Sequence, residues 1–298
     1  MVIFFRKYKS KIALMVFICV LFCAVSCLLD FKTLGKQKMP GLEKKSVFMA
    51  AENTVAKNTD KDVNEPRLHA VSAALYDADD ETFIYGKNMR DSMANASTTK
   101  ILTCIVALEK ADINDTVTIS QNAASQPEVK LGLVAGNSYN MKDLLYGMML
   151  ESFNDCAYAI AEHVGGSTEG FAKLMNEKCK ELGLKYTHFT NPTGLYDEEQ
   201  YTPPSEMAMI MEYAMKDETR AKVLGTYQYK TKATEQHPEG IPLTSTMYSR
   251  IYGNEAPGVL VKGGKTGFTN EAGSCLVSYA VTNKGNAYVF CTGGATYR

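Results

Sequence analysis

Several residue types and patterns are scarce in this chain of 298 residues. It contains no tryptophan, which by itself excludes nothing, and only four histidines. Its charges nearly cancel, since 32 Lys and Arg face 33 Asp and Glu and leave a formal net charge of −1. Such a balance creates no overall basic field, and no nucleic-acid recognition signature occurs. We therefore expect no nucleic-acid partner.

The cysteines lack the spacing of a metal site or a disulfide framework. No C-x-x-C pair is present, and the cysteines beyond the first 30 residues stand singly among apolar neighbours: Cys104, Cys156, Cys179, Cys275 and Cys291. An odd number of isolated cysteines is typical of small buried hydrophobic side chains. Because the histidines are also isolated, the sequence predicts no metal site, and it implies no cofactor.

The first 29 residues differ in kind from the rest. A basic segment, residues 6–11, precedes an unbroken apolar run of 18 residues at positions 12–29. This order directs export, and the run is about as long as the minimum for spanning a bilayer. A cleaved signal peptide, an uncleaved anchor and lipid attachment at Cys27 all stay open. Each predicts an exported protein, either held at the outer face of the bacterial cytoplasmic membrane through residues 12–29 or secreted.

The remaining chain predicts one mixed α/β domain. Residues 30–65 are polar, rich in lysine and without periodicity, which is typical of a flexible tether. Residues 68–89 predict two strands around the turn DADDET, and helical patterns dominate residues 141–216. Three further strands are predicted at residues 258–268, 274–281 and 287–292. Strands, then helices, then strands indicate a single domain, residues 66–298, with a helical lobe.

The stretch NASTTKILTC, residues 95–104, places Ser97 and Lys100 three positions apart where an apolar helix begins. Asn95 is predicted to cap this helix, which would put both residues in its first turn. Residues three apart share a helix face, so the amine can reach the hydroxyl. By itself S-x-x-K is a weak pattern, because a surface serine and lysine often have this spacing.

Two later motifs strengthen the first. Ser152, Phe153 and Asn154 form an S-x-N motif at a break between predicted helices, residues 141–151 and 154–166. Lys265, Thr266 and Gly267 form a K-T-G motif at the end of a predicted strand. The ordered set S-x-x-K, S-x-N and K-T-G is typical of penicillin-binding proteins and class A β-lactamases.

Longer stretches extend this similarity. SFNDCAYAIAEHVGGS, MNEKCKELGLKYTHFTNPTGL and GGKTGFTNEAGSCLVSYA resemble the D-alanyl-D-alanine carboxypeptidases among the low-molecular-mass penicillin-binding proteins, across residues 66–298. The resemblance implies a β-lactamase/transpeptidase-like fold, with a central antiparallel sheet covered by helices and an all-helical lobe. Members usually continue past the last strand into a further helix. The end at Arg298 therefore predicts either an incomplete sequence or a partly exposed sheet.

The resemblance also implies an activity and partners. The protein would be a serine-type hydrolase that removes the terminal D-alanine from peptidoglycan stem peptides ending in D-Ala-D-Ala, with β-lactams as inhibitors. Ser97 would form the seryl ester, and Lys100 would be its base, provided that burial and nearby positive charge keep the amine neutral. Ser152 would relay a proton to the leaving group. Asn154 would hold the substrate amide and anchor Lys100.

The third motif would bind the substrate. By the same resemblance Lys265 and Thr266 would hold the terminal carboxylate, and Gly267 would let the backbone come close to the substrate. The backbone N–H groups of Ser97 and Phe268 would form the oxyanion hole, in which each donor contributes about 3 kcal/mol.

Two alternatives stay open. A β-lactamase of the same fold would need a glutamate in an E-x-x-L-N segment between the second and third motifs. No such segment occurs, and Glu198, Glu199 and Glu206 do not fit the pattern. A penicillin-binding sensor without turnover would differ from the carboxypeptidase in consuming no peptide.

Overall fold

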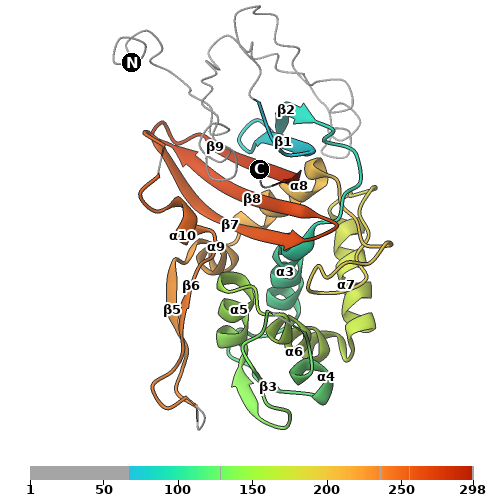
Figure 1. The fold of residues 1–298 in the computed structure, drawn as a ribbon, viewed down its shortest axis with the longest axis vertical. Helices are drawn as coiled ribbons and strands as arrows, with labels where there is room; N and C mark the ends of the chain where they lie inside the picture. Colours follow the sequence, from blue (N-terminus) through green and yellow to red (C-terminus); the bar gives the residue numbers. More distant parts are fainter. Residues whose placement is uncertain (1–66, 128, 235–236, 255, 297–298) are drawn as a thin grey trace, which may run out of the picture.

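The computed structural model describes residues 67–127, 129–234, 237–254 and 256–296. The predicted signal or anchor segment, residues 1–29 with Cys27, and the tether, residues 30–65, lie outside these residues. Within the part described, a sheet lies on one side of a lobe of helices (Figure 1). No helix in this part is both long and apolar enough to cross a bilayer.

The main sheet is five-stranded and antiparallel throughout, in the order β2-β1-β9-β8-β7. Its strands are β1 (Ser72–Asp77), β2 (Thr82–Lys87), β7 (Val259–Thr269), β8 (Gly273–Thr282) and β9 (Ala287–Ala295). Both predicted hairpins are therefore confirmed. The β1–β2 hairpin extends the sheet formed by β7, β8 and β9, because β1 pairs with β9. In this pairing Leu75 lies opposite Phe290. This pairing joins the two ends of the described chain in one sheet.

The helices fill the chain between these hairpins. They are the 3-10 helix η3 (Ala96–Thr99), α3 (Lys100–Lys110), α4 (Gln121–Ala124), α5 (Met141–Leu150), α6 (Asn154–Gly165), α7 (Thr168–Glu181), α8 (Pro204–Met215), α9 (Glu218–Gly225) and α10 (Tyr248–Ile251). Two short ribbons join them, β3 (Thr116–Thr118) with β4 (Ser138–Asn140), and β5 (Gln228–Lys230) with β6 (Pro242–Thr244). The mixed α/β fold with a helical lobe is thus confirmed.

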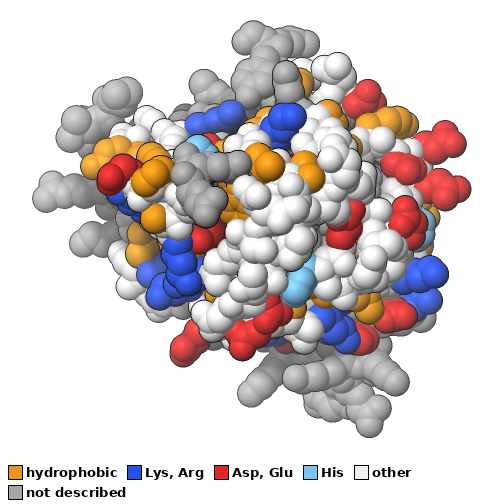
Figure 2. Space-filling view, turned by 90° about the horizontal axis from the view of Figure 1, so that it is seen from below, with side chains coloured by type: hydrophobic (Ala, Val, Ile, Leu, Met, Phe, Trp, Pro, Cys, Tyr) orange, Lys and Arg blue, Asp and Glu red, His pale blue; other side chains and the backbone are white. Residues whose placement is uncertain are grey.

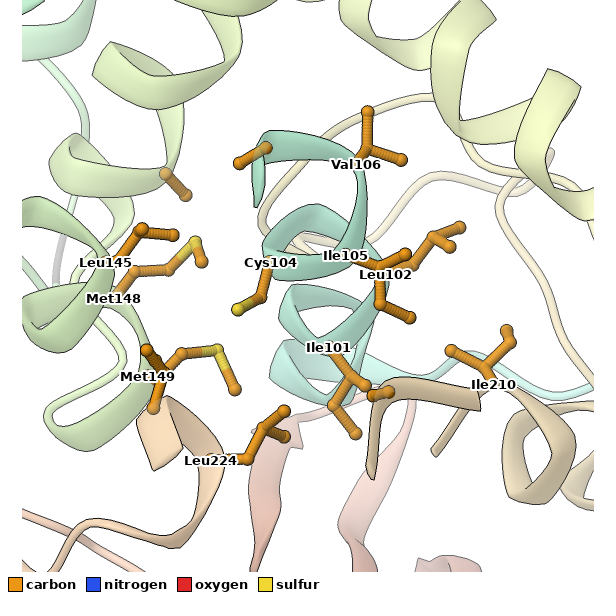
Figure 3. Packing of buried hydrophobic residues seen from close by; sticks show 14 of the residues in the cluster. Ile101, Leu102, Cys104, Ile105, Val106, Leu145, Met148, Met149, Ile210 and Leu224 are labelled. Atoms are coloured by element: carbon orange, nitrogen blue, oxygen red, sulfur yellow. The ribbon is translucent and has the colours of Figure 1, made fainter. Parts of the chain in front are cut away.

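Helix α3 forms the centre of the molecule and runs from the sheet into the lobe (Figure 1). Its residues from Lys100 to Ala107 are all buried. Figure 3 shows its apolar side chains among those of Leu145, Met148 and Met149, which belong to α5. Full burial of each large apolar side chain contributes about 1.5–3 kcal/mol. This packing holds the first residue of α3, Lys100, in place at the sheet.

The buried cysteines confirm one expectation. All five in the described residues are free and buried: Cys104, Cys156, Cys179, Cys275 and Cys291. They act as small apolar side chains, and none is paired in a disulfide.

Two local expectations were wrong or incomplete. Asn95 makes no side-chain cap, because η3 precedes the α-helix and Ala96 adopts a left-handed φ of 44°. Ser97 therefore lies in the 3-10 turn, and only Lys100 belongs to α3. The sequence did not predict α9 or the β5–β6 ribbon. Strands of three residues are too short to show an alternating pattern.

The lower face of the helical lobe is polar. Figure 2 shows acidic and basic side chains interspersed over this face, with scattered apolar side chains between them. A mixed distribution of this kind is typical of a solvated surface.

Candidate active site

The first and third motifs touch through their backbones. η3 packs against β7. A Cβ atom added at Gly267 would lie 2.7 Å from the backbone nitrogen of Ser97 and 3.1 Å from the carbonyl oxygen of Asn95. A side chain at residue 267 would therefore push the Ser97 turn away from the strand. Glycine is required here because of this close approach to the Ser97 turn, a reason that the sequence did not predict.

The Lys100 amine lies among three oxygen atoms. Nζ is 2.8 Å from Ser97 Oγ, 2.9 Å from Asn154 Oδ1 and 2.8 Å from the carbonyl oxygen of Thr193. The two carbonyl-type oxygens can only accept hydrogen bonds, whereas the serine hydroxyl can also donate. A neutral amine has two N–H groups and one lone pair. Its two N–H groups therefore match Asn154 and Thr193, and its lone pair faces the hydroxyl of Ser97.

The surroundings of Lys100 favour this neutral form. Its side chain is fully buried. Burial is the main reason that the pKa of Lys100 falls well below its ordinary value, and the positive charge of Lys265 lowers it further. Cys156 offsets part of this shift. A lysine with a depressed pKa one turn from a serine can accept the proton of that serine.

The second motif lies between α5 and α6, where the helix break was predicted. Asn154 begins α6, and its backbone nitrogen donates to the carbonyl oxygen of Val129 at 2.7 Å. Ser152 has a left-handed φ of 68°, a strained conformation for a residue with a side chain. Within the described residues no hydrogen bond joins the Ser152 hydroxyl to Lys100. The structure thus brings Asn154, but not Ser152, into direct contact with the amine.

The third motif carries a buried positive charge. Lys265 is 1% exposed, and its Nζ donates to the carbonyl oxygen of Thr266 at 2.9 Å. Burial lowers the pKa of Lys265 to about 7, Arg250 lowers it as well, and Glu151 acts in the opposite direction. The hydroxyl of Thr266 lies 3.0 Å from that of Thr246. Phe268, the next residue but one, has an exposed side chain.

Sequence reasoning missed the contact of Lys100 with the turn at residues 191–195. Asn191 Oδ1 accepts hydrogen bonds from the backbone nitrogens of Thr193 and Gly194 at 3.1 and 2.9 Å, which fixes the turn. Gly194 has a φ of 85°, and a Cβ atom there would lie 1.7 Å from the carbonyl oxygen of Ala96. NPTGL ends one of the stretches that carry the family resemblance. Its Asn and Gly, which favour tight turns, were the available signal.

A second missed residue supports the rim of the site. The Asp155 carboxylate accepts hydrogen bonds from the backbone nitrogens of Leu131, Gly132 and Leu133 at 2.8–3.0 Å. It thereby ties the loop before β4 to the first turn of α6. Nowhere in the described part of the chain do three or more His, Cys, Asp or Glu side chains form a group that could hold a metal ion.

Taken together, these contacts can support acyl transfer. A half-buried serine faces the Lys100 amine, whose pKa is depressed by burial, and a buried lysine and a threonine hydroxyl lie on the adjacent strand. The serine can form an ester with a carbonyl carbon, and the strand can hold a carboxylate.

The chain is similar to known proteins over most of its length. A family model described as D-alanyl-D-alanine carboxypeptidase, peptidase S11, matches residues 59–292. The chain is 36% identical over 241 residues to D-alanyl-D-alanine carboxypeptidase DacF of Bacillus subtilis, and the match covers 79% of this chain and 60% of that relative. It is 30% identical to D-alanyl-D-alanine carboxypeptidase of Streptomyces sp. strain K15, with 76% and 81% covered.

A solved structure has the same fold. The crystal structure of D-alanyl-D-alanine carboxypeptidase from Mycobacterium tuberculosis H37Rv superposes with a TM-score of 0.73 at 25% identity. The superposition covers 80% of this chain and 88% of the other. The β-lactamase/transpeptidase-like architecture expected from the motifs is thereby confirmed.

Proposed function

The chain belongs to the D-alanyl-D-alanine carboxypeptidase family, and from this premise we propose that it removes the terminal D-alanine from peptidoglycan stem peptides ending in D-Ala-D-Ala. One observation carries the proposal. The fully buried Lys100 has its amine 2.8 Å from Ser97 Oγ, with carbonyl-type oxygens at its other two contacts. The family acts on peptidoglycan, so the site of action is the cell wall.

The first step is acylation. Ser97 Oγ attacks the carbonyl carbon of the penultimate D-alanine while the serine proton passes to Lys100 Nζ. The backbone N–H groups of Ser97 and Phe268 stabilise the oxyanion, and the close approach of Gly267, the residue before Phe268, to the Ser97 nitrogen supports this role. The C–N bond then breaks. The leaving D-alanine nitrogen takes a proton that Ser152 relays from Lys100.

The second step is hydrolysis. D-alanine departs, and a water molecule takes its place beside the ester. Lys100, neutral again, accepts a proton from this water, and the water oxygen attacks the ester carbonyl. As the bond between the carbonyl carbon and Ser97 Oγ breaks, Lys100 returns the proton to Ser97 Oγ, which regenerates the serine hydroxyl and the neutral amine. Lys265 and Thr266 bind the terminal carboxylate before the first step, and Asn154 holds the substrate amide. No metal and no organic cofactor enters either step.

An assay of free D-alanine tests this function. We expect the domain of residues 66–298, which we propose to be the catalytic unit, to release D-alanine from a pentapeptide ending in D-Ala-D-Ala over many turnovers. Ser97→Ala should abolish both this release and covalent labelling by a fluorescent penicillin, because the nucleophile is lost. Penicillin labelling of the unmodified protein without D-alanine release would favour a sensor instead. Labelling that persists in Ser97→Ala would place the nucleophile elsewhere.

We also propose that residues 12–29 direct export and hold the protein at the outer face of the cytoplasmic membrane. The basic segment before the apolar run supports this placement. Deleting residues 1–29 should move the protein from the membrane fraction to the soluble fraction. A mature N-terminus directly after the run, without lipid, would instead show that this segment is a cleaved signal peptide.

A further inference from the structure

The segment between β6 and α10 touches the second motif with its backbone. The backbone nitrogen of Thr246 donates to the carbonyl oxygen of Leu150 at 3.0 Å. The backbone nitrogen of Thr244 donates to Glu151 Oε1 at 2.8 Å. Leu150 ends α5 directly before the turn that contains Ser152. These two bonds fix the position of Thr246 relative to the second motif.

The side chain of Thr246 reaches the third motif. Its Oγ1 lies 3.0 Å from Oγ1 of Thr266, which is 9% exposed. Each hydroxyl carries one proton and can also accept. Within the described residues the Thr266 hydroxyl makes no other hydrogen bond, so its orientation depends on Thr246 when no substrate is bound.

Building on the proposed function, we propose that Thr246 is a positioning residue that aims the Thr266 hydroxyl at the terminal carboxylate of the substrate. A carboxylate only accepts hydrogen bonds, so a bound substrate takes the proton of Thr266. Thr246 then donates its own proton to Thr266 Oγ1. Hydrogen bonds in such a chain polarise one another, which strengthens the contact with the carboxylate.

This assignment explains why one residue is bonded to both motifs. The backbone bond to Leu150 holds Thr246 at a set distance from the second motif, and its hydroxyl holds the first side chain after Lys265. Thr246 therefore couples the place where the peptide carboxylate binds to the place where the scissile bond lies. Loss of its hydroxyl should weaken recognition of the carboxylate without removing the nucleophile or the base.

Two thioester substrates test the inference. One is an N-acyl-D-alanyl thioester whose leaving group carries a carboxylate, and the other is the same thioester with that carboxylate methylated. Thr246→Val should lower kcat/KM for the first by about two- to tenfold, the effect of one hydrogen bond, mainly through KM. The methylated thioester should be turned over at an unchanged rate. Thr246→Ser keeps the hydroxyl, so its kcat/KM for the first thioester should equal that of the unmodified protein.

A matched control makes the same threonine-to-valine substitution in the main sheet. Thr282 lies at the end of β8, and its buried Oγ1 has no hydrogen-bond partner among the residues described. Thr282→Val should leave both thioesters unaffected. Thermal melting accompanies every variant, and Thr246→Ala takes the place of Thr246→Val if the valine variant does not fold.

The outcomes separate the two proposals. If the unmodified protein turns over neither thioester and releases no D-alanine, the proposed function fails. If the unmodified protein is active but Thr246→Val loses activity equally on both thioesters, or behaves as Thr282→Val does, the positioning role of Thr246 is overturned.

Discussion

Burial of the Lys100 amine has a free-energy cost that favours loss of its proton. A charged amine without full compensation is strongly disfavoured in an apolar interior, and the usual response is loss of the proton. Here the side chain is fully buried, and its neighbours at hydrogen-bond distance are neutral oxygens without a carboxylate among them. The residue is therefore held in the basic form that acyl transfer requires.

The two buried lysines predict a pH profile with two limbs. The base needs Lys100 neutral, so kcat/KM for D-alanine release should rise with pH as this residue loses its proton. Carboxylate binding needs Lys265 charged, so the value should fall as pH passes about 7, the lowered pKa of Lys265. In Lys265→Arg the guanidinium stays charged, and the alkaline fall should move to higher pH. Rates of D-alanine release between about pH 5 and pH 10 check this.

The control for this profile lies on the same strand. Lys262 is exposed on β7, so Lys262→Arg should leave both limbs in place. An alkaline limb that stays unchanged in Lys265→Arg would show that a different group titrates there.

At the scale of elements, the Gly194 turn and strand β7 both pack closely against η3. The Gly194 turn contacts the carbonyl oxygen of Ala96 from one side, and Gly267 of β7 contacts the nitrogen of Ser97 from the other. Both contacts are too close for a Cβ atom. Two glycines therefore pack closely against the 3-10 turn that carries Ser97.

Replacement of Gly194 should disturb both stability and activity. Gly194→Ala places a Cβ atom against Ala96 at a φ of 85°, so we expect a loss of roughly 2–4 kcal/mol in the free energy of unfolding. It should also displace the Thr193 carbonyl from Lys100 and slow penicillin labelling of Ser97 by at least about tenfold, the effect of roughly 1.4 kcal/mol. Urea unfolding and a labelling time course measure the two effects.

Gly166 gives a control with the same backbone geometry. It follows α6 with a φ of 72°, but no atom lies within 4 Å of an added Cβ. Gly166→Ala should cost only about 1 kcal/mol and leave labelling unchanged. Equal effects of the two substitutions would contradict the close contact at Gly194.

At the scale of the whole molecule, the site combines segments far apart in the chain. Of the three glutamates considered for a β-lactamase, Glu206 is already engaged in hydrogen bonds. The Glu206 carboxylate accepts hydrogen bonds from the backbone nitrogens of Lys185 and Tyr186 and from the Thr187 hydroxyl. It therefore has a structural role. The E-x-x-L-N segment that activates water in class A β-lactamases is absent.

This predicts a long-lived adduct with penicillin. Lys100 alone must activate the deacylating water, and a penicilloyl group, which stays attached, obstructs the approach of that water. In the peptidyl ester the D-alanine has left, and water can enter. We expect a penicilloyl adduct on Ser97 that lasts minutes or longer, seen by intact-protein mass spectrometry, alongside many turnovers of peptide. Rapid turnover of penicillin with no D-alanine release would favour the β-lactamase.

Much of the local structure could be predicted from the sequence. The alternating patterns of residues 68–89 and 274–292 predicted both hairpins, and apolar spacing after Lys100 predicted α3, because these signals repeat over a few residues. The three motifs also indicated the site, since serine and lysine three apart can meet within one helical turn. Direct contact between Asn154 and Lys100 follows the same resemblance and is present in the structure.

Only the tertiary structure decided the rest. The carbonyl oxygen of Thr193 lies 93 residues from Lys100 in the chain, yet it occupies one of the three contacts of the amine. The pairing of Thr246 with Thr266 and the close approach of Gly267 to Ser97 likewise join separate segments. Asn95 does not cap α3, because a 3-10 turn with a left-handed Ala96 precedes that helix. Sequence patterns report local periodicity, whereas such contacts depend on how distant elements pack.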